Sequence, residues 1–129
     1  YVSKAGSSRS ELVLAIVDRQ SHNHVGNISL LNINYINRTA DFAIIIGEKE
    51  YWGKGIGKEA GRLLIEHAFS ALNLNRISCG TTEDNIGMQS LALSLKFRKE
   101  GIRRSAVYKS GKYRDTIEYG LLRSEWENS

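Results

Sequence analysis

The stretch that decides the fold is GEKEYWGKGIGKEA, residues 47–60, in which Gly53, Gly55 and Gly57 alternate between an apolar run and a helical pattern. Glycine has no Cβ, so consecutive backbone N–H groups in such a loop can point at one anion. The start of a helix adds unpaired N–H groups and a favourable dipole. The same stretch carries two positive charges, Lys54 and Lys58. It therefore predicts a loop that binds phosphate or pyrophosphate, with a simple tight turn as the alternative.

This stretch resembles two well-known phosphate-binding motifs, but it matches neither of them fully. A Walker A loop fails, because Gly57 and Lys58 are followed by Glu59 in place of Ser or Thr. A Rossmann fingerprint is closer, since Gly55 to Ala60 fits G-x-G-x-x-A. Its acidic partner would be Glu83, 28 residues on from Gly55 where about 20 is usual. A nucleotide-binding Rossmann fragment is thus a weaker alternative.

Upstream of the loop, three apolar runs rich in β-branched residues predict strands: Leu12–Val17, Val25–Ile33 and Ala40–Ile46. The segments between them, residues 18–24 and 34–39, are short and polar. Short connections favour antiparallel neighbours, so we expect a meander.

Downstream, apolar residues at steps of three and four from Ile56 predict an amphipathic helix of about four turns. Arg76–Thr82 predicts a further strand, and Asn85 or Asp84 can cap a second helix. Two more extended segments around the turn KSGK predict a closing hairpin. The expected order is β-β-β-α-β-α-β-β, an α/β (α+β) fold with a mixed, partly antiparallel sheet.

Composition limits the function classes. The chain has 129 residues with 41% hydrophobic and 25% charged residues, which is typical of one globular domain. No apolar run is long enough for a membrane helix, and the net charge of +4 comes without any block of like charge that would favour nucleic acid. A single cysteine excludes an internal disulfide and favours a reducing, cytoplasmic location. Because the chain opens with Tyr1 and its one methionine is Met88, we expect the translated product to begin earlier.

The loop Trp52-Gly53-Lys54-Gly55-Ile56-Gly57 resembles the pyrophosphate loop of GCN5-related N-acetyltransferases (GNATs), whose pattern is [QR]-x-x-G-x-[GA]. The likeness extends from residue 12 to residue 122. It is similar to the branch with ribosomal-protein N-terminal, spermidine and amino-sugar N-acetyltransferases. It rests on NINYINRTADFAIIIGEKEYWGKGIGKEA, AFSALNLNRI, Asn85, KFRKEG and GKYRDTIEYGLL.

The resemblance implies a single GNAT-like domain over residues 1–129, with two central strands that splay apart to admit the pantetheine arm of acetyl-CoA. These strands would be Ala40–Ile46 and Arg76–Thr82. Unpaired backbone groups of the first strand would bond the amides of pantetheine. The resemblance also implies a strand and two short helices before Leu12, and we expect this sequence to lack them. The implied cofactor-binding residues are Phe42, Ile44, Ile46, Trp52, Gly53, Lys54, Gly55, Ile56, Gly57, Lys58 and Asn85.

The sequence departs from the family pattern at four positions. Trp52 replaces the Gln or Arg that opens the loop, and Lys96 replaces a common glycine. Gly80 stands where some members have a glutamate base. Ala92 stands where the family often has a tyrosine that protonates the leaving thiolate. Two usual catalytic positions are therefore empty.

An amine that attacks a thioester must first lose a proton, so a base is required. The candidates are Asp41 and Glu83, with Asp84 beside them. Ser90 and Ser94 are candidate donors to the leaving sulfur. Cys79 is expected to be an inert buried thiol, since no histidine lies near it in sequence.

No histidine, cysteine or acidic spacing supports a metal site, so no metal is expected near His22, His24 or His67. A basic cluster is expected to be solvated or to attract an acidic acceptor; it comprises Arg98, Lys99, Arg103 and Arg104.

The leading hypothesis is an acetyl-CoA-dependent N-acetyltransferase that acts by direct attack of a primary amine, on a peptide N-terminus or an amino sugar. The alternatives are a spermidine or polyamine acetyltransferase and an acyl-CoA-binding domain with impaired catalysis. No nucleic acid or membrane partner is expected, and a homodimer is left open.

Overall fold

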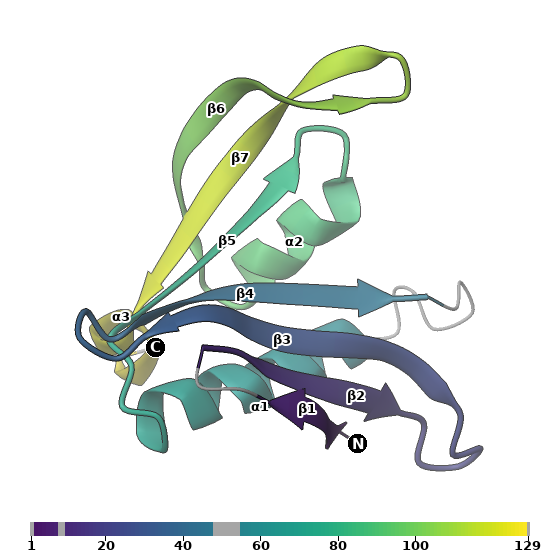
Figure 1. Ribbon diagram of the computed structural model, residues 1–129, viewed down its shortest axis with the longest axis vertical. Helices are drawn as coiled ribbons and strands as arrows, with labels where there is room; N and C mark the ends of the chain where they lie inside the picture. Colours follow the sequence, from purple (N-terminus) through teal and green to yellow (C-terminus); the bar gives the residue numbers. More distant parts are fainter. Residues whose placement is uncertain (1, 8–9, 48–54, 129) are drawn as a thin grey trace.

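The computed structural model describes residues 2–7, 10–47 and 55–128. Its strands form one seven-stranded sheet in the order β1-β2-β3-β4-β5-β7-β6 (Figure 1). The strands are β1 Val2–Ser7, β2 Leu12–Val17, β3 His24–Asn34, β4 Thr39–Ile46, β5 Arg76–Thr82, β6 Arg98–Lys109 and β7 Lys112–Leu122. The helices are α1 Ile56–Ser70, α2 Ile86–Ser94 and α3 Arg123–Glu127.

The predicted meander is confirmed. β2, β3 and β4 are antiparallel neighbours, and their bounds differ from the predicted ones by at most one residue at each end. The Rossmann alternative is wrong, because that fold needs parallel strands joined by crossover helices before the glycine loop. Here α1 makes the first crossover, and it connects β4 to the parallel strand β5.

Both helices form where the apolar periodicity placed them. One face of α1 is buried, and its buried positions recur every three or four residues, as expected for an amphipathic helix. They are Ala60, Leu64, Ile65, Ala68 and Phe69. Asn85 caps α2, because its Oδ1 accepts a hydrogen bond from the backbone N–H of Met88 at 3.0 Å. The most completely buried large side chains lie between this layer and the sheet: Ile28, Leu30, Ile65, Leu74, Ile77, Leu95 and Leu121.

The central strands splay as expected. β4 and β5 pair only through Thr39 with Arg76, Ala40 with Ile77, and Asp41 with Ser78. Beyond Asp41, β4 continues to Ile46 while hydrogen bonded to β3, and β5 continues to Thr82 while bonded to β7. Figure 1 shows the resulting V, with β4 and β5 as its two arms. Within the described residues, the facing edges of these arms do not pair with each other beyond Asp41 and Ser78.

The sheet has two distinct faces at the splay. A Cβ on Gly57 or Gly61 of α1 would touch Ile44 or Phe42 of β4, so even-numbered β4 residues face the helices. Ala40 pairs with Ile77, and paired residues share a face. The opposite surface, here called the open face, therefore carries Asp41, Arg76, Ser78, Gly80 and Glu118.

Three elements exceed the sequence prediction. β1 precedes the first predicted strand, α3 follows the last one, and β6 is much longer than its apolar part. Most of β6 is exposed, so it lacks the alternation that would identify it. α3 is fixed to α1 by a hydrogen bond that Trp126 Nε1 donates to Glu66 Oε2 at 2.7 Å.

Gly26 is required by the close approach of β3 to β4. A Cβ at this position would overlap the backbone carbonyl oxygen of Ile45. We therefore expect Gly26→Ala to lower the free energy of unfolding by about 1–3 kcal/mol, the usual range for overpacking. Chemical denaturation measures this. Gly47→Ala is the control, since no atom of the described residues lies within 4 Å of the added methyl group, and equal stability of the two variants would contradict the assignment.

Candidate functional site

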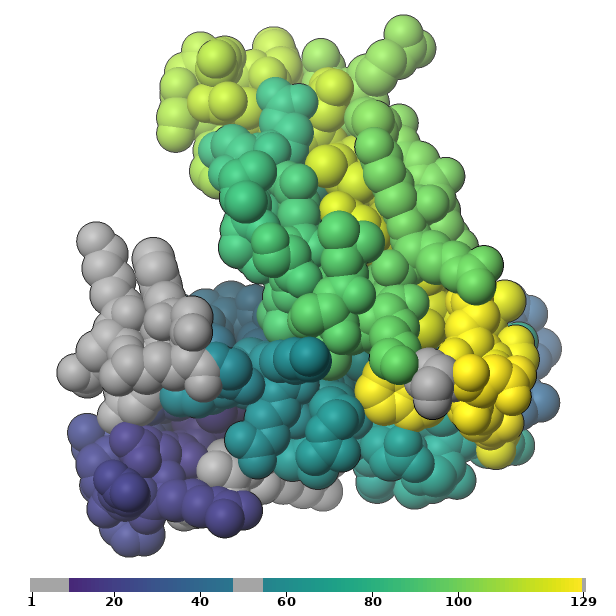
Figure 2. All heavy atoms as spheres, turned by 180° about the vertical axis from the view of Figure 1, so that it is seen from behind, coloured from purple at the N-terminus to yellow at the C-terminus, as the bar shows by residue number. Residues whose placement is uncertain are grey.

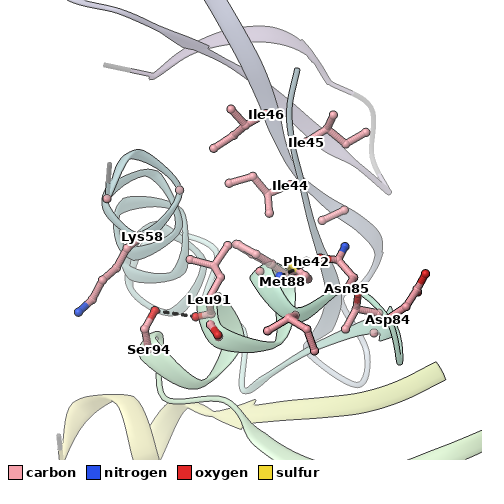
Figure 3. Close-up of a pocket in the computed structure, with 18 residues that line it drawn as sticks. Phe42, Ile44, Ile45, Ile46, Lys58, Asp84, Asn85, Met88, Leu91 and Ser94 are labelled. Atoms are coloured by element: carbon pink, nitrogen blue, oxygen red, sulfur yellow. Dashed lines mark hydrogen bonds between the residues drawn. The ribbon is translucent and has the colours of Figure 1, made fainter. Parts of the chain in front are cut away.

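A cavity of about 1030 Å³ lies in the splay, between β4 and β5 on one side and α1 and α2 on the other (Figure 3). That volume is at the upper end for small-molecule sites and suits a large, extended ligand. In Figure 2, seen from behind, green segments lie above the purple-to-teal part that contains α1, and the yellow C-terminal end reaches down beside that part. The lining residues are Phe42, Ala43, Ile44, Ile45, Ile46, Gly55, Gly57, Lys58, Gly80, Thr81, Asp84, Asn85, Ile86, Gly87, Met88, Ser90, Leu91 and Ser94.

One wall of the cavity is the free edge of β4. Phe42, Ile44 and Ile46 line it, and in Figure 3 Ile44 and Ile46 point toward α1. Among the described residues, β5 pairs with this edge of β4 only as far as Asp41. Backbone N–H and C=O groups on such an edge need a partner other than a strand. An amide-containing chain that lies along β4 would supply it.

The mouth of the cavity is the beginning of α1. Gly55 precedes the first turn with φ of 78°, in the left-handed region that favours glycine, and no side chain of the described residues caps the helix. The first N–H groups of a helix can bind an anion. Lys58 also lines the cavity, and no described atom lies within 4 Å of a Cβ position on Gly55.

The remaining residues expected to bind a cofactor divide into three groups. Asn85 both caps α2 and lines the cavity. Ile56 packs against the hydrophobic core and is not part of the lining. Trp52, Gly53 and Lys54 lie outside the described residues.

Of the candidate bases, Asp41 and Glu83 do not line the cavity, whereas Asp84 does. Asp41 is exposed on the open face, where its Oδ2 accepts a hydrogen bond from Asn32 Nδ2 at 3.0 Å. Glu83 is exposed in the turn after β5. Asp84 lines the cavity. The pKa of its carboxyl is lowered mainly by a hydrogen bond with Thr82 and further by one with Lys109, which favours the carboxylate. Lys109 Nζ lies 3.3 Å from Asp84 Oδ2.

Cys79 lies on the helix-covered face of β5 and is buried, with 4% of its surface exposed. Burial, followed by the nearby carboxylates of Glu118 and Asp41, raises the pKa of its thiol to about 12. The reactive form of cysteine is the thiolate, so this thiol is a poor nucleophile at neutral pH.

The two serines on α2 are Ser90 and Ser94. Both line the cavity, and the hydroxyl of Ser94 donates a hydrogen bond to the Leu91 carbonyl at 2.8 Å, as drawn in Figure 3. Ala92 is 1% exposed and packs in the core.

The basic cluster is partly neutralised by acidic neighbours. Arg98 Nε lies 2.7 Å from Glu125 Oε2, and Arg103 Nε lies 3.4 Å from Glu118 Oε1. Within the described part of the chain, no group of three or more His, Cys, Asp or Glu side chains is placed to hold a metal ion. None of the helices described is long and apolar enough to cross a membrane.

Several lining residues were not predicted, chiefly Thr81, Met88 and Leu91. Met88 and Leu91 of α2 also pack against the hydrophobic core, which is the role that their apolar side chains indicate in the sequence. Thr81 follows from strand alternation once the splay is known, since it shares the helix-covered face of β5 with Cys79.

Comparison with known proteins agrees with this geometry. The GNAT acetyltransferase domain family matches residues 2–98. YdaF of Bacillus subtilis (strain 168), by name a candidate ribosomal N-acetyltransferase, is 38% identical over 102 residues, which cover 79% of this chain and 55% of that protein. The spermidine N(1)-acetyltransferase of Vibrio cholerae is 30% identical over 113 residues, 88% of this chain and 65% of the relative.

Solved structures extend the agreement to three dimensions. The spermidine N-acetyltransferase of Vibrio cholerae, in complex with CoA and spermine, superposes with a TM-score of 0.86 at 30% identity, covering 93% of this chain and 70% of that one. The chain spans between half and two-thirds of the length of these curated relatives. Its matched sequence, splayed strands and glycine-led helix make it a member of the GNAT acetyltransferase domain family.

Proposed function

We propose that this protein binds acetyl-CoA in the splay between β4 and β5 and transfers the acetyl group to a primary amine by direct attack. The observation that carries this proposal is the free edge of β4, which forms the wall of a cavity ending at the uncapped start of α1. Few other ligands combine an anionic end with a long, amide-containing arm. The family membership and the CoA complex of the Vibrio cholerae protein support the same reading.

The described residues fit this co-substrate at both ends. The pyrophosphate would lie at Gly55 and the first turn of α1, near the charge of Lys58. The pantetheine arm would run along Phe42 to Ile46, which places the thioester toward the apex of the V, near Gly80. A backbone N–H on the free edge of β4 can then stabilise the carbonyl oxygen as negative charge develops there.

A binding domain without catalysis is the alternative that Gly80 and Ala92 keep open. Loss of the tyrosine does not require loss of activity, since a simple thiol has a pKa of about 8.5 and its thiolate leaves without an acid. The base is the more important group, because an ammonium ion has no lone pair with which to attack. Asp41 and Glu83 stay proposals for that role.

For the acceptor, we favour an amine on a peptide N-terminus or an amino sugar over a polyamine. A polyamine needs several converging carboxylates to pair with its ammonium groups. On the open face, two of the carboxylates near the splay already have arginine partners: Glu100 pairs with Arg76, and Glu118 with Arg103. Curated relatives are named for ribosomal and for spermidine acetylation, so both classes belong in the test. A dodecamer is described for the Vibrio cholerae enzyme, and assembly of several copies is proposed here by analogy.

Cofactor binding is tested by Gly55→Val. Its side chain would strain a φ of 78° and occupy the space assigned to the phosphates. We expect CoA at about 100 times its dissociation constant to raise the Tm of the wild type by several degrees and to leave this variant unchanged. Gly111→Val is the matched control, with a φ of 82° at the β6–β7 turn, and it should lose stability but keep the CoA response. The same CoA response in all three proteins would refute the site.

Direct transfer predicts that Cys79 takes no part in the chemistry. Cys79→Ala should keep most of the wild-type rate, and the folded wild type should resist a thiol reagent at pH 8, far below a pKa of about 12. Reaction should become fast once denaturant exposes the thiol. Mass spectrometry showing an acetylated Cys79 during turnover would replace direct transfer with an acyl-enzyme.

The acceptor class is tested by assaying spermidine, a nucleotide-linked amino sugar and a short peptide with a free N-terminus at equal concentrations. We expect the peptide or the amino sugar to give the highest kcat/KM, because arginines offset the carboxylates of the open face. A preference for spermidine would mean that carboxylates from elsewhere converge on the site.

A further inference from the structure

The open face carries one carboxylate whose position relative to the splay was not visible in the sequence. Glu118 of β7 lies directly opposite Gly80 of β5 in the antiparallel register. Gly80 also lines the cavity, so this residue belongs both to the cavity wall and to the open face. Any group seated on Gly80 lies beside the place where the two arms of the V separate.

The side chain of Glu118 fills the space that a side chain on Gly80 would need. Its Oε2 lies 2.9 Å from the position of a Cβ on Gly80. Its other oxygen, Oε1, is held by Arg103 Nε at 3.4 Å and by Thr116 Oγ1 at 3.3 Å. The carboxylate is therefore oriented by contacts at one oxygen, while the second oxygen is turned toward β5.

The other carboxylates near the splay are less well placed. Glu100 lies over Gly120, farther from the opening, and is engaged by both terminal nitrogens of Arg76. Asp84 is ion paired with Lys109. Asp41 belongs to the last β4–β5 pair, which is the closed end of the V, whereas Gly80 lies two residues further along β5, about 6–7 Å toward the open end.

The environment of Cys79 agrees with this placement. The thiol lies one residue before Gly80, and both Glu118 and Asp41 act on its pKa through their charge. The strand register places Asp41 of β4 opposite Ser78 and Glu118 of β7 opposite Gly80, so these two carboxylates flank β5 on its two sides, close to the point where β4 departs.

The approach of the acceptor follows from the two faces. The co-substrate would occupy the helix side of the splay, so an amine can reach the thioester from the open face. The first carboxylate it meets beside Gly80 is that of Glu118.

We propose, building on the acetyltransferase function above, that Glu118 accepts the proton of the acceptor ammonium and so replaces from β7 the carboxylate that Gly80 lacks on β5. One N–H proton of the ammonium passes to Glu118 and then to water, which leaves a neutral amine. Its nitrogen lone pair forms the new C–N bond to the acetyl carbonyl carbon as the C–S bond breaks. The second N–H proton ends on the departing sulfur, so the products are the acetamide, CoA with a free thiol, and one proton in solution.

The test uses the whole chain and the acceptor with the highest kcat/KM in the assay above. Glu118→Gln keeps the size of the side chain and removes the charge, so we expect kcat to fall by about 100-fold, within the usual range for general bases. Glu100→Gln, which removes a carboxylate from the same face, is the control and should keep the wild-type kcat within about threefold of its value.

A second pair of variants moves the carboxylate between strands. Glu118→Ala should be as slow as Glu118→Gln, and Gly80→Glu combined with Glu118→Ala should recover at least tenfold in kcat, because the new side chain enters the space that Glu118 vacated. The rise in Tm caused by CoA should be the same in all these proteins, which separates proton transfer from damage to the fold or the cofactor site.

The outcomes separate the two proposals. A wild type that binds CoA and acetylates no amine contradicts the proposed function, and with it the role of Glu118. An active wild type with an equally active Glu118→Gln variant contradicts this inference alone. A variant with a raised KM for the amine and unchanged kcat would show Glu118 binding the acceptor without taking its proton, and loss of the CoA response would assign it a structural role; either result overturns the proposal.

Discussion

The parallel pairing of β4 and β5 stops after Asp41 and Ser78, and most of the site depends on this interruption. A strand edge in the middle of a sheet cannot stay without hydrogen-bond partners at low cost. The protein secures each arm of the V on its other edge, β4 through β3 and β5 through β7, so the splay persists without closing. The edge of β4 is thereby kept available for a ligand.

The start of α1 follows from the same geometry. The helix begins beside the open end of β4, where a Cβ on Gly57 would make ordinary van der Waals contact with Ile44, Ile46 and Leu91 at 3.5 Å. Gly55 turns the chain into the helix with a positive φ. The arrangement brings helix N–H groups to one end of an apolar channel, so a ligand with an anionic head and a long arm can be bound at both ends.

Local patterns carried much of this structure in the sequence. The run Leu12–Val17, the strand Arg76–Thr82, the start of α1 at Ile56 and the cap at Asn85 were all predicted from apolar spacing and capping chemistry. β6 was predicted as the first arm of the closing hairpin but not in its full length, because an exposed strand shows little apolar alternation. The splay and the acetyl-CoA ligand were predicted from the family resemblance alone. Residue spacing does not indicate where the pairing of two strands separated by a helix will end.

Pairing register explains why the carboxylate beside Gly80 could not be found in the sequence. Gly80 and Glu118 are far apart in the chain, and a shift of one residue would turn Glu118 to the other face of the sheet. The register is held by the buried pairs on either side, Cys79 with Tyr119 and Thr81 with Ile117, which keep β7 in place against the helix-covered core. Because Gly80 has no side chain, the side chain of Glu118 on β7 fills the space beside it. A glutamate at position 80 on β5 would need the same space. The absence of a residue at the usual position is thus linked, through sheet geometry alone, to the presence of its chemical group on the neighbouring strand.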